Sequence, residues 1–340
     1  MSDGLYDAVL LVSFGGPDGP EDVLPFLENV LRGRNVPRER MLEVAEHYHH
    51  FGGKSPINEQ NRALLAALER EFARRGPALP VYWGNRNWHP LLGDTLRDMA
   101  DAGVKRALAF VTSAYSSYSG CRQYRENIAA ACAPLGDRAP QVDKIRVFFN
   151  HPGFVGPMAA RVGRALGRFP AEARGEIPVL FTAHSIPTAM AAGCRYGAQL
   201  AEASRLVAER AGVKRWELVY QSRSGPPSQP WLEPDVCDRI RQLHAQGVRA
   251  LVVAPVGFIS DHMEVLYDLD TEAAELCRTL GVEMARAETV GTDPDFVSMV
   301  RDLVAERHFQ TPERLAIGGL AASHDVCPVD CCPAPVMRRP

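Results

Sequence analysis

The stretch GVKRALAFVTSAYSS, Gly103–Ser117, decides the fold, because the chain repeats it as GVRALVVAPVGFIS, Gly247–Ser260. In both copies an apolar run typical of a strand follows a glycine and ends in small and hydroxyl residues. Three other segments of the first half recur in the same order in the second half. They are AVLLVSFGGP (8–17) with PVLFTAHSIP (178–187), PVYWGNRN (80–87) with ELVYQSRSG (217–225), and the strand-to-helix segments 145–162 and 285–303. The chain therefore predicts one set of four strands, followed by a second set.

Helical patterns lie between these runs. INEQNRALLAALEREFARRG and GAQLAEASRLVAERAG carry apolar residues three and four positions apart. Strands that alternate with helices predict an α/β fold, here two similar Rossmann-like domains, each a four-stranded parallel sheet flanked by helices. We expect the domains at residues 1–170 and 171–310, with the last helix returning to the first domain, and a cysteine-bearing extension over 311–340. One large doubly wound sheet is the alternative.

Composition excludes several classes of protein. The 340 residues include 38 basic and 41 acidic ones in mixed order, for a net charge of −3. No basic tract favours nucleic acid as a partner. No segment approaches the roughly 20 continuous apolar residues of a membrane span, and the N-terminus is typical of a first strand rather than a signal peptide. We therefore expect a cytoplasmic protein.

The conspicuous polar motifs follow the predicted strands, where ligands bind in open α/β sheets. His184 comes directly after the run VLFTA. An imidazole at this place can exchange a proton near neutral pH or ligate a metal. A core histidine bonded to the backbone is the alternative.

Three acids follow the run ALVVAPVGFI at intervals of four residues: Glu264, Asp268 and Glu272. On an α-helix this spacing places them along one stripe. Apolar residues on both flanks indicate that the helix packs closely, so the stripe would be half-buried and could hold a hard cation or pass protons outwards. His184 facing Glu264 would suit a divalent first-row metal. A solvated helix face is the alternative.

Eight cysteines are present, and three of them, Cys327, Cys331 and Cys332, crowd together near the C-terminus. Thiolates are the usual ligands of iron–sulfur clusters and of structural zinc. A disordered tail with free thiols, or a zinc site, is the alternative to a cluster.

Together the motifs LLVSFGGP, HFGGKSPIN, FTAHSIP, QSRSGPPSQPWLEPDV and PVGFISDHMEVLYDLDTEA resemble the ferrochelatases, lyases that insert Fe²⁺ into a porphyrin in heme synthesis. YWGNRNW and FFNHPGF resemble the actinobacterial type, whose substrate is coproporphyrin III. The resemblance implies that His184 and Glu264 face each other on the metal-insertion side of the porphyrin, as catalytic and metal-binding residues. It also implies that Asp268 and Glu272 continue as a path for iron or for protons.

The resemblance further implies a substrate-binding set. Phe14 and Trp231 would line an apolar slot, Asn87 stands in a motif beside it, and Arg32, Arg34, Tyr48, Ser55 and Ser222 stand at positions that contact propionates. Core packing is the alternative for the aromatic residues. Some Gram-positive relatives have tyrosine where Phe14 stands and histidine where Asn87 stands, so their finer mechanism does not transfer directly.

Many ferrochelatases carry a [2Fe-2S] cluster held by three tail cysteines and one from the body. By resemblance, Cys121 is the expected fourth ligand beside Cys327, Cys331 and Cys332, with Cys132 and Cys194 as alternatives. A chelatase for protoporphyrin IX or for another metal remains open, as does a non-catalytic carrier of heme or metal. Transient contact with neighbouring heme-pathway enzymes is a further expectation.

Overall fold

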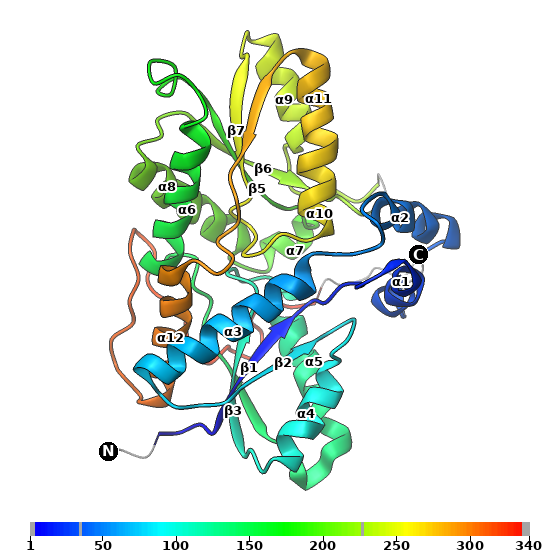
Figure 1. Ribbon diagram of the computed structural model, residues 1–340, viewed down its shortest axis with the longest axis vertical. Helices are drawn as coiled ribbons and strands as arrows, with labels where there is room; N and C mark the ends of the chain where they lie inside the picture. The colour runs from blue at the N-terminus through cyan, green and yellow to red at the C-terminus, as the bar shows by residue number, and fades with distance from the viewer. Residues whose placement is uncertain (1–3, 34–35, 226–227, 335–340) are drawn as a thin grey trace.

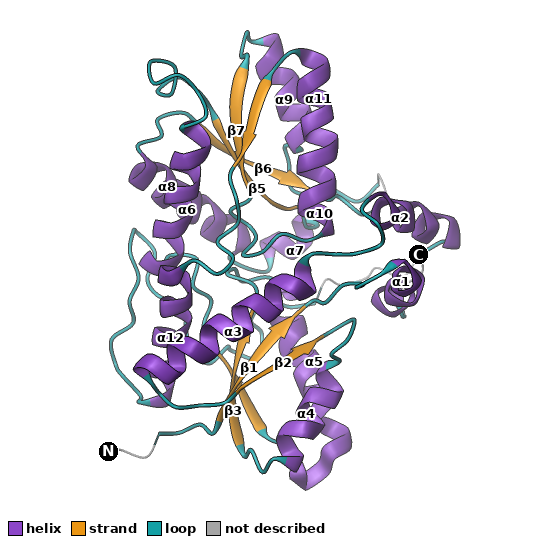
Figure 2. Cartoon of the chain, in the orientation of Figure 1, coloured by secondary structure: helices purple, strands orange, loops and turns teal. Residues whose placement is uncertain are grey.

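The computed structural model describes residues 4–33, 36–225 and 228–334. Two four-stranded parallel sheets stand one above the other, with helices on the faces of both (Figures 1 and 2). The first sheet has the order β2-β1-β3-β4 and the second has the order β6-β5-β7-β8. The predicted fold class, two parallel four-stranded sheets flanked by helices, is confirmed. Among the described helices, none has both the length and the apolar character needed to cross a bilayer.

The elements of the first half come in this order: β1 (Ala8–Ser13), α1 (Val23–Leu31), α2 (Arg38–His50), α3 (Ile57–Arg75), β2 (Val81–Asn85), α4 (Leu92–Asp101), β3 (Arg106–Val111), α5 (Gln123–Cys132), β4 (Gln141–Lys144) and α6 (Pro152–Leu166). The second half contains β5 (Val179–His184), α7 (Thr188–Ala192), α8 (Tyr196–Ala211), β6 (Trp216–Gln221), α9 (Val236–Ala245), β7 (Ala250–Ala254), α10 (Met263–Val265), α11 (Ala274–Leu280), β8 (Glu283–Arg286) and α12 (Pro294–His308). Short π-helices span Tyr118–Arg122 and Leu266–Ala273.

The last strand of each sheet lies earlier in the chain than the repeats predict. The sequence places the fourth strand from Ile145 onwards, but β4 ends at Lys144, and one further backbone bond joins Ile145 to Ala109. The apolar residues Phe148 and Phe149 instead turn into the core, where both are 1% exposed. A short apolar run has the same pattern in a strand and in a buried connection, so the spacing could not separate the two.

The central strands have two buried faces. In β1, Val9 and Leu11 face the helix α3, whereas the alternating residues Leu10 and Val12 face α4 and α5. Period-two alternation with both sides apolar is what a parallel sheet covered by helices requires. β5 and β7 repeat this arrangement between α8 on one face and α9 with α11 on the other.

The two halves exchange their final helices. α6 follows the first sheet in sequence but packs against β7, β8 and α8 of the second half, and α12 crosses back to pack against α3 (Figure 1). One buried apolar cluster therefore runs through both sheets, from Val9 and Phe110 to Phe181 and Val252. The division of the chain into domains near residue 170 stays a prediction.

Candidate active site

His184 and Glu264 come together at the carboxyl ends of two neighbouring strands. His184 is the last residue of β5, and Glu264 lies in α10, which follows β7. The Nε2 atom of His184 is 3.4 Å from Oε1 of Glu264, with 32% and 46% of the two side chains exposed. The pair is therefore anchored by a buried sheet and open to an incoming molecule.

The pair holds opposite charges at neutral pH. Burial alone lowers the pKa of His184, but the charge of Glu264 and its hydrogen bond outweigh burial and raise that pKa to about 9. Burial alone raises the pKa of Glu264, but the charge and hydrogen bond of His184 lower it to about 2. Each group thus stabilises the ionised form of the other.

The backbone fixes the direction of the imidazole. Nδ1 of His184 donates to the carbonyl of Ser185, so Nε2 is the nitrogen that faces Glu264 and can gain or lose a proton. The hydroxyl of Tyr196 donates to the backbone carbonyl of His184 at 3.0 Å, and the hydroxyl of Ser185 donates to the carbonyl of Leu232 at 2.8 Å. These bonds hold the end of β5 in place.

Asp268 and Glu272 continue from Glu264 along the π-helix Leu266–Ala273. The spacing of the acids predicts an α-helix, so the π-helix is a difference from the sequence analysis. Asp268 accepts hydrogen bonds from the Ser222 hydroxyl and from Nε2 of Gln221, the latter at 3.2 Å.

The acid in the middle of this line can exchange protons near neutral pH. Burial raises the pKa of Asp268, and the negative charges of Glu264 and Glu272 raise it further, whereas the hydrogen bond from Ser222 lowers it. The resulting pKa of Asp268 is about 7. Burial also raises the pKa of Glu272. Glu272 is exposed, whereas Asp268 is only partly so, and the line therefore ends at the solvent.

An aromatic cluster supplied by the first half lies near the pair. The Phe26 ring packs edge-on against Phe14, Tyr48 and Trp88, with centroid distances of 6.2, 5.7 and 6.2 Å. Burial raises the pKa of Tyr48 far above its usual value, with a further contribution from the charge of Glu264. Tyr48 is therefore a neutral phenol close enough to the Glu264 carboxylate to feel its charge. Phe14, in the same cluster, is 36% exposed.

The other predicted substrate contacts fall in different environments. Asn87 donates from Nδ2 to the carbonyl of Phe14 at 3.3 Å. Arg32 is exposed at the end of α1, and it lines a cavity of about 510 Å³ together with Trp88. Trp231 is partly buried, and its Nε1 has no hydrogen-bond partner among the described residues. Arg34 lies outside the described residues.

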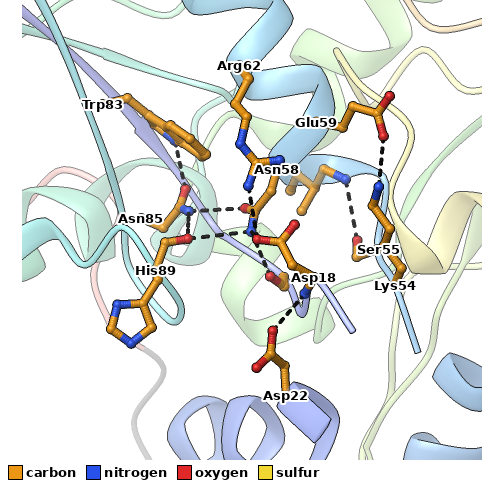
Figure 3. Close-up of polar contacts among 12 residues, drawn as sticks. Asp18, Asp22, Lys54, Ser55, Asn58, Glu59, Arg62, Trp83, Asn85 and His89 are labelled. Carbon is orange, nitrogen blue, oxygen red and sulfur yellow. Dashed lines mark hydrogen bonds and ion pairs between the residues drawn. The ribbon is translucent and has the colours of Figure 1, made fainter. Parts of the chain in front are cut away.

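Ser55 lies beside a buried polar network that the sequence analysis missed (Figure 3). Its side chain is 2% exposed, and its hydroxyl accepts a bond from the backbone N–H of Ile57 at 3.5 Å. At the centre of the network is Asn58, fully buried, whose Nδ2 donates to the carbonyl of Gly16 at 2.8 Å and to Asp18 at 3.1 Å. Asn85 donates to the side chain of Asn58 at 3.1 Å. The network ties the loop after β1 to the loop after β2, and these loops carry Phe14 and Trp88.

A second histidine was also missed. Nδ1 of His262 is 4.0 Å from Oε2 of Glu264, and burial lowers the pKa of His262. The signal was present in the motif SDHMEV, where a histidine stands two residues before the acid.

Four cysteines converge away from this pair. Interactions with the thiols of Cys327 and Cys332 lower the pKa of Cys121, and the sulfurs of Cys331 and Cys332 are 3.6 Å apart. Of the two alternatives, Cys132 donates to the carbonyl of Pro140 at 3.8 Å. Cys194 donates to the carbonyl of Met190 at 3.3 Å, although the charges of Cys331 and Cys121 reach it.

Comparison with solved structures identifies the fold as that of a chelatase. The structure titled SirB from Bacillus subtilis with Fe3+ superposes with a TM-score of 0.57 at 10% identity, covering 92% of this chain and 99% of that chain. An identity this low shows the fold alone.

Sequence comparison identifies the family. The ferrochelatase family model matches residues 6–308. The chain is 61% identical to a ferrochelatase of Rhodopirellula baltica, over 96% of this chain and 93% of that protein. It is 56% identical to a coproporphyrin III ferrochelatase of Streptomyces coelicolor, over 98% of this chain and 95% of that protein. The chain belongs to the ferrochelatase family.

Proposed function

We propose that this protein is a lyase that inserts Fe²⁺ into coproporphyrin III, with both iron and porphyrin as substrates. The observation that carries the proposal is the His184–Glu264 pair, 3.4 Å apart and open to an incoming molecule at the strand ends. The 56% identity to the Streptomyces coelicolor enzyme over nearly the whole chain supports coproporphyrin III as the porphyrin.

Metal insertion releases two protons, because two pyrrole N–H groups must lose them as Fe²⁺ enters. In the proposed site His184 first passes its own proton to the line of acids formed by Glu264, Asp268 and Glu272. It then accepts each pyrrole proton at Nε2. The pKa of Asp268, about 7, suits a group that takes up and releases protons at neutral pH. The exposed Glu272 then returns the protons to water. His184 and Glu264 would also contact the incoming metal.

The aromatic cluster provides the opposite side of the proposed site. The ring of a porphyrin needs an apolar surface, and its propionates need cations and hydroxyls. We assign Phe14, Tyr48 and Trp231 to the ring, Asn87 to the support of Phe14, and the exposed Arg32 to a propionate. Ser222 acts through Asp268, to which it is bonded. The buried Ser55 is left out of the proposed contacts.

We further propose that Cys121, Cys327, Cys331 and Cys332 hold a [2Fe-2S] cluster. Four converging thiols match the tetrathiolate ligand set of such clusters, and two tail thiols interact with Cys121 closely enough to lower its pKa. When bound, a cluster of this kind supplies one-electron redox chemistry. The thiols themselves fasten the tail to the segment after β3, which is where Cys121 lies.

The test of the function is an anaerobic insertion assay with Fe²⁺ that compares coproporphyrin III with protoporphyrin IX. We expect faster turnover with coproporphyrin III, and His184→Ala should abolish insertion while porphyrin affinity changes by less than about tenfold. A protein that binds porphyrin without turnover would be a carrier. A preference for protoporphyrin IX would overturn coproporphyrin III as the substrate, but the protein would still be a ferrochelatase.

The test of the cluster is the visible absorption of the purified protein and its bleaching by dithionite. Cys121→Ser should remove this absorption, whereas the matched control Cys237→Ser, on α9, should keep it. A colourless protein that contains zinc would overturn the cluster.

Location in the cytoplasm and transient contact with neighbouring enzymes of heme synthesis stay predictions.

A further inference from the structure

One side chain beside the thiols has no role in the sites above. His324 lies in the tail three residues before Cys327, and its Nε2 is 3.7 Å from the sulfur of Cys331. The ligand atoms of His324, Cys327 and Cys331 all lie within 4.8 Å of one another. The part of the chain that the structure describes thus gathers five donor groups at this place.

The position of His324 is set by contacts that do not involve the thiols. Its neighbour Asp325 accepts a bond from Nη2 of Arg314 at 2.6 Å and lies 3.7 Å from Nη1 of Arg307 on α12. Earlier in the tail, Asn150 donates to the carbonyl of Leu320 at 2.6 Å. The segment that leads to His324 is therefore attached to the body of the protein.

A [2Fe-2S] cluster has four terminal ligand positions, so one of the five donors must remain outside them. Cys327 and Cys332 interact with Cys121 closely enough to lower its pKa, and Cys332 in turn contacts Cys331, so all four sulfurs belong to one group. Within the described part of the chain, His324 contacts this group by a hydrogen bond with Cys331, and its side chain is exposed. This places the imidazole at the edge of the ligand set.

We infer that His324 donates a hydrogen bond from Nε2–H to the Cys331 sulfur of the bound cluster and raises the reduction potential of that cluster. The inference rests on the proposed cluster. Reduction adds negative charge to the iron–sulfur core, and an N–H aimed at a ligand sulfur stabilises that charge. His324 is then a positioning and tuning residue, while the four thiolates remain the ligands.

The test is a redox titration of the intact protein, followed by the electron paramagnetic resonance of the reduced cluster, with iron and sulfide contents measured in parallel. His324→Ala should retain iron and sulfide at the parent level and make reduction about tenfold less favourable, which is about 59 mV for one electron. His324→Gln keeps an N–H donor and should recover at least half of the shift. His244→Ala, a substitution on α9, is the matched control and should titrate like the parent.

The outcomes separate this inference from the proposed cluster. Loss of iron from His324→Ala would make His324 a ligand and overturn the hydrogen-bond role. An unchanged potential with full iron content would overturn the tuning role. Absence of an iron–sulfur signal in the parent protein would instead overturn the cluster, and the parent sample shows this before any variant is compared.

Discussion

At the scale of single residues, the charge state of His184 depends on one neighbour. Glu264 raises the pKa of the imidazole to about 9, against the opposing effect of burial. Without that carboxylate only the burial and weaker contributions remain, and the resting site would lose its stored proton at neutral pH.

We therefore predict that Glu264→Gln lowers the pKa of His184 from about 9 to its ordinary value of 6.5 or below. The titration of the imidazole followed by nuclear magnetic resonance measures this directly. Asp270→Asn is the matched control, because this acid of the adjoining π-helix is bonded to Arg286 at 2.6 Å rather than to the pair. A His184 pKa that stays near 9 in Glu264→Gln would show that another group sets it.

The same substitution has a pH-dependent effect on stability. The pKa of His184 is raised by folding, so its contribution is complete below pH 6.5 and is lost as the pH rises through about 9. The pKa of Glu264 is lowered, so its contribution is complete above pH 4.5 and is lost as the pH falls through about 2. The loss of unfolding free energy in Glu264→Gln should thus be largest between pH 4.5 and 6.5.

The residues of this pair could be predicted from the sequence, because each follows a recognisable strand and parallel strands present their carboxyl ends at one edge. The side chains that hold the site in place could not be predicted from the sequence. Tyr196 bonds to the carbonyl of His184, and Asn58 joins the loops after β1 and β2. These side-chain contacts depend on the tertiary fold, and no periodicity in the chain encodes them.

At the scale of elements, the acid line shows where spacing stops being informative. Intervals of four residues predict an α-helix, yet residues Leu266–Ala273 form a π-helix. In a π-helix each backbone hydrogen bond joins residues five apart rather than four apart, and short π-helices occur often at functional sites. The type of residue at each position was predictable, whereas the local helix type is not encoded in the spacing of the acids.

Another element-scale feature is a buried ion pair that holds α12. Arg146, which follows β4, donates two bonds of 3.0 Å to Glu306, and the arginine side chain is fully buried. Removing one partner leaves an unpaired charge in the core, and such losses cost about 3–5 kcal/mol.

We predict that Glu306→Ala lowers the free energy of unfolding by about 3–5 kcal/mol in urea denaturation. The double variant Arg146→Met/Glu306→Leu should lose much less, because no buried charge is left. Asp94→Ala, which breaks an exposed pair with Arg97 at 2.9 Å, is the control and should change stability by at most about 1 kcal/mol. Equal losses in the single and double variants would contradict this account.

At the scale of the whole molecule, α1 and α2 stand apart from the sheets. They form a small core of their own, made of Val23, Phe26, Leu27, Met41 and Ala45. α2 reaches the other half through a stack of His47 on Tyr267, with ring centroids 3.7 Å apart. Both helices lie to one side of the two sheets (Figure 1).

We predict that the backbone amides of α1 and α2 exchange hydrogen faster than those of β1, β3 and β5, because small satellite cores open more easily than the main one. Adding metal-free coproporphyrin III should slow exchange in α1 and α2, since Tyr48 and the end of α1 would contact the ring. Hydrogen exchange read by mass spectrometry measures both effects, with α4 as the unaffected reference. Equal exchange rates in α1, α2 and the three strands would contradict the prediction that α1 and α2 open more easily than the main core.

The repeated strand order could be predicted from the sequence, because the same apolar runs occur twice. The packing of α6 against the second sheet could not be predicted, since a helix pattern shows which side is apolar but not which sheet covers it.

The crossing of α6 and α12 has a consequence for cutting the chain in two. Each half leaves a surface of its own sheet to be covered by a helix that follows the other half in sequence. A cut between the sheets would therefore expose apolar residues on both sides, since α6 and the helices it covers share one buried cluster with α12 and α3. The two halves are joined by packing as well as by the chain.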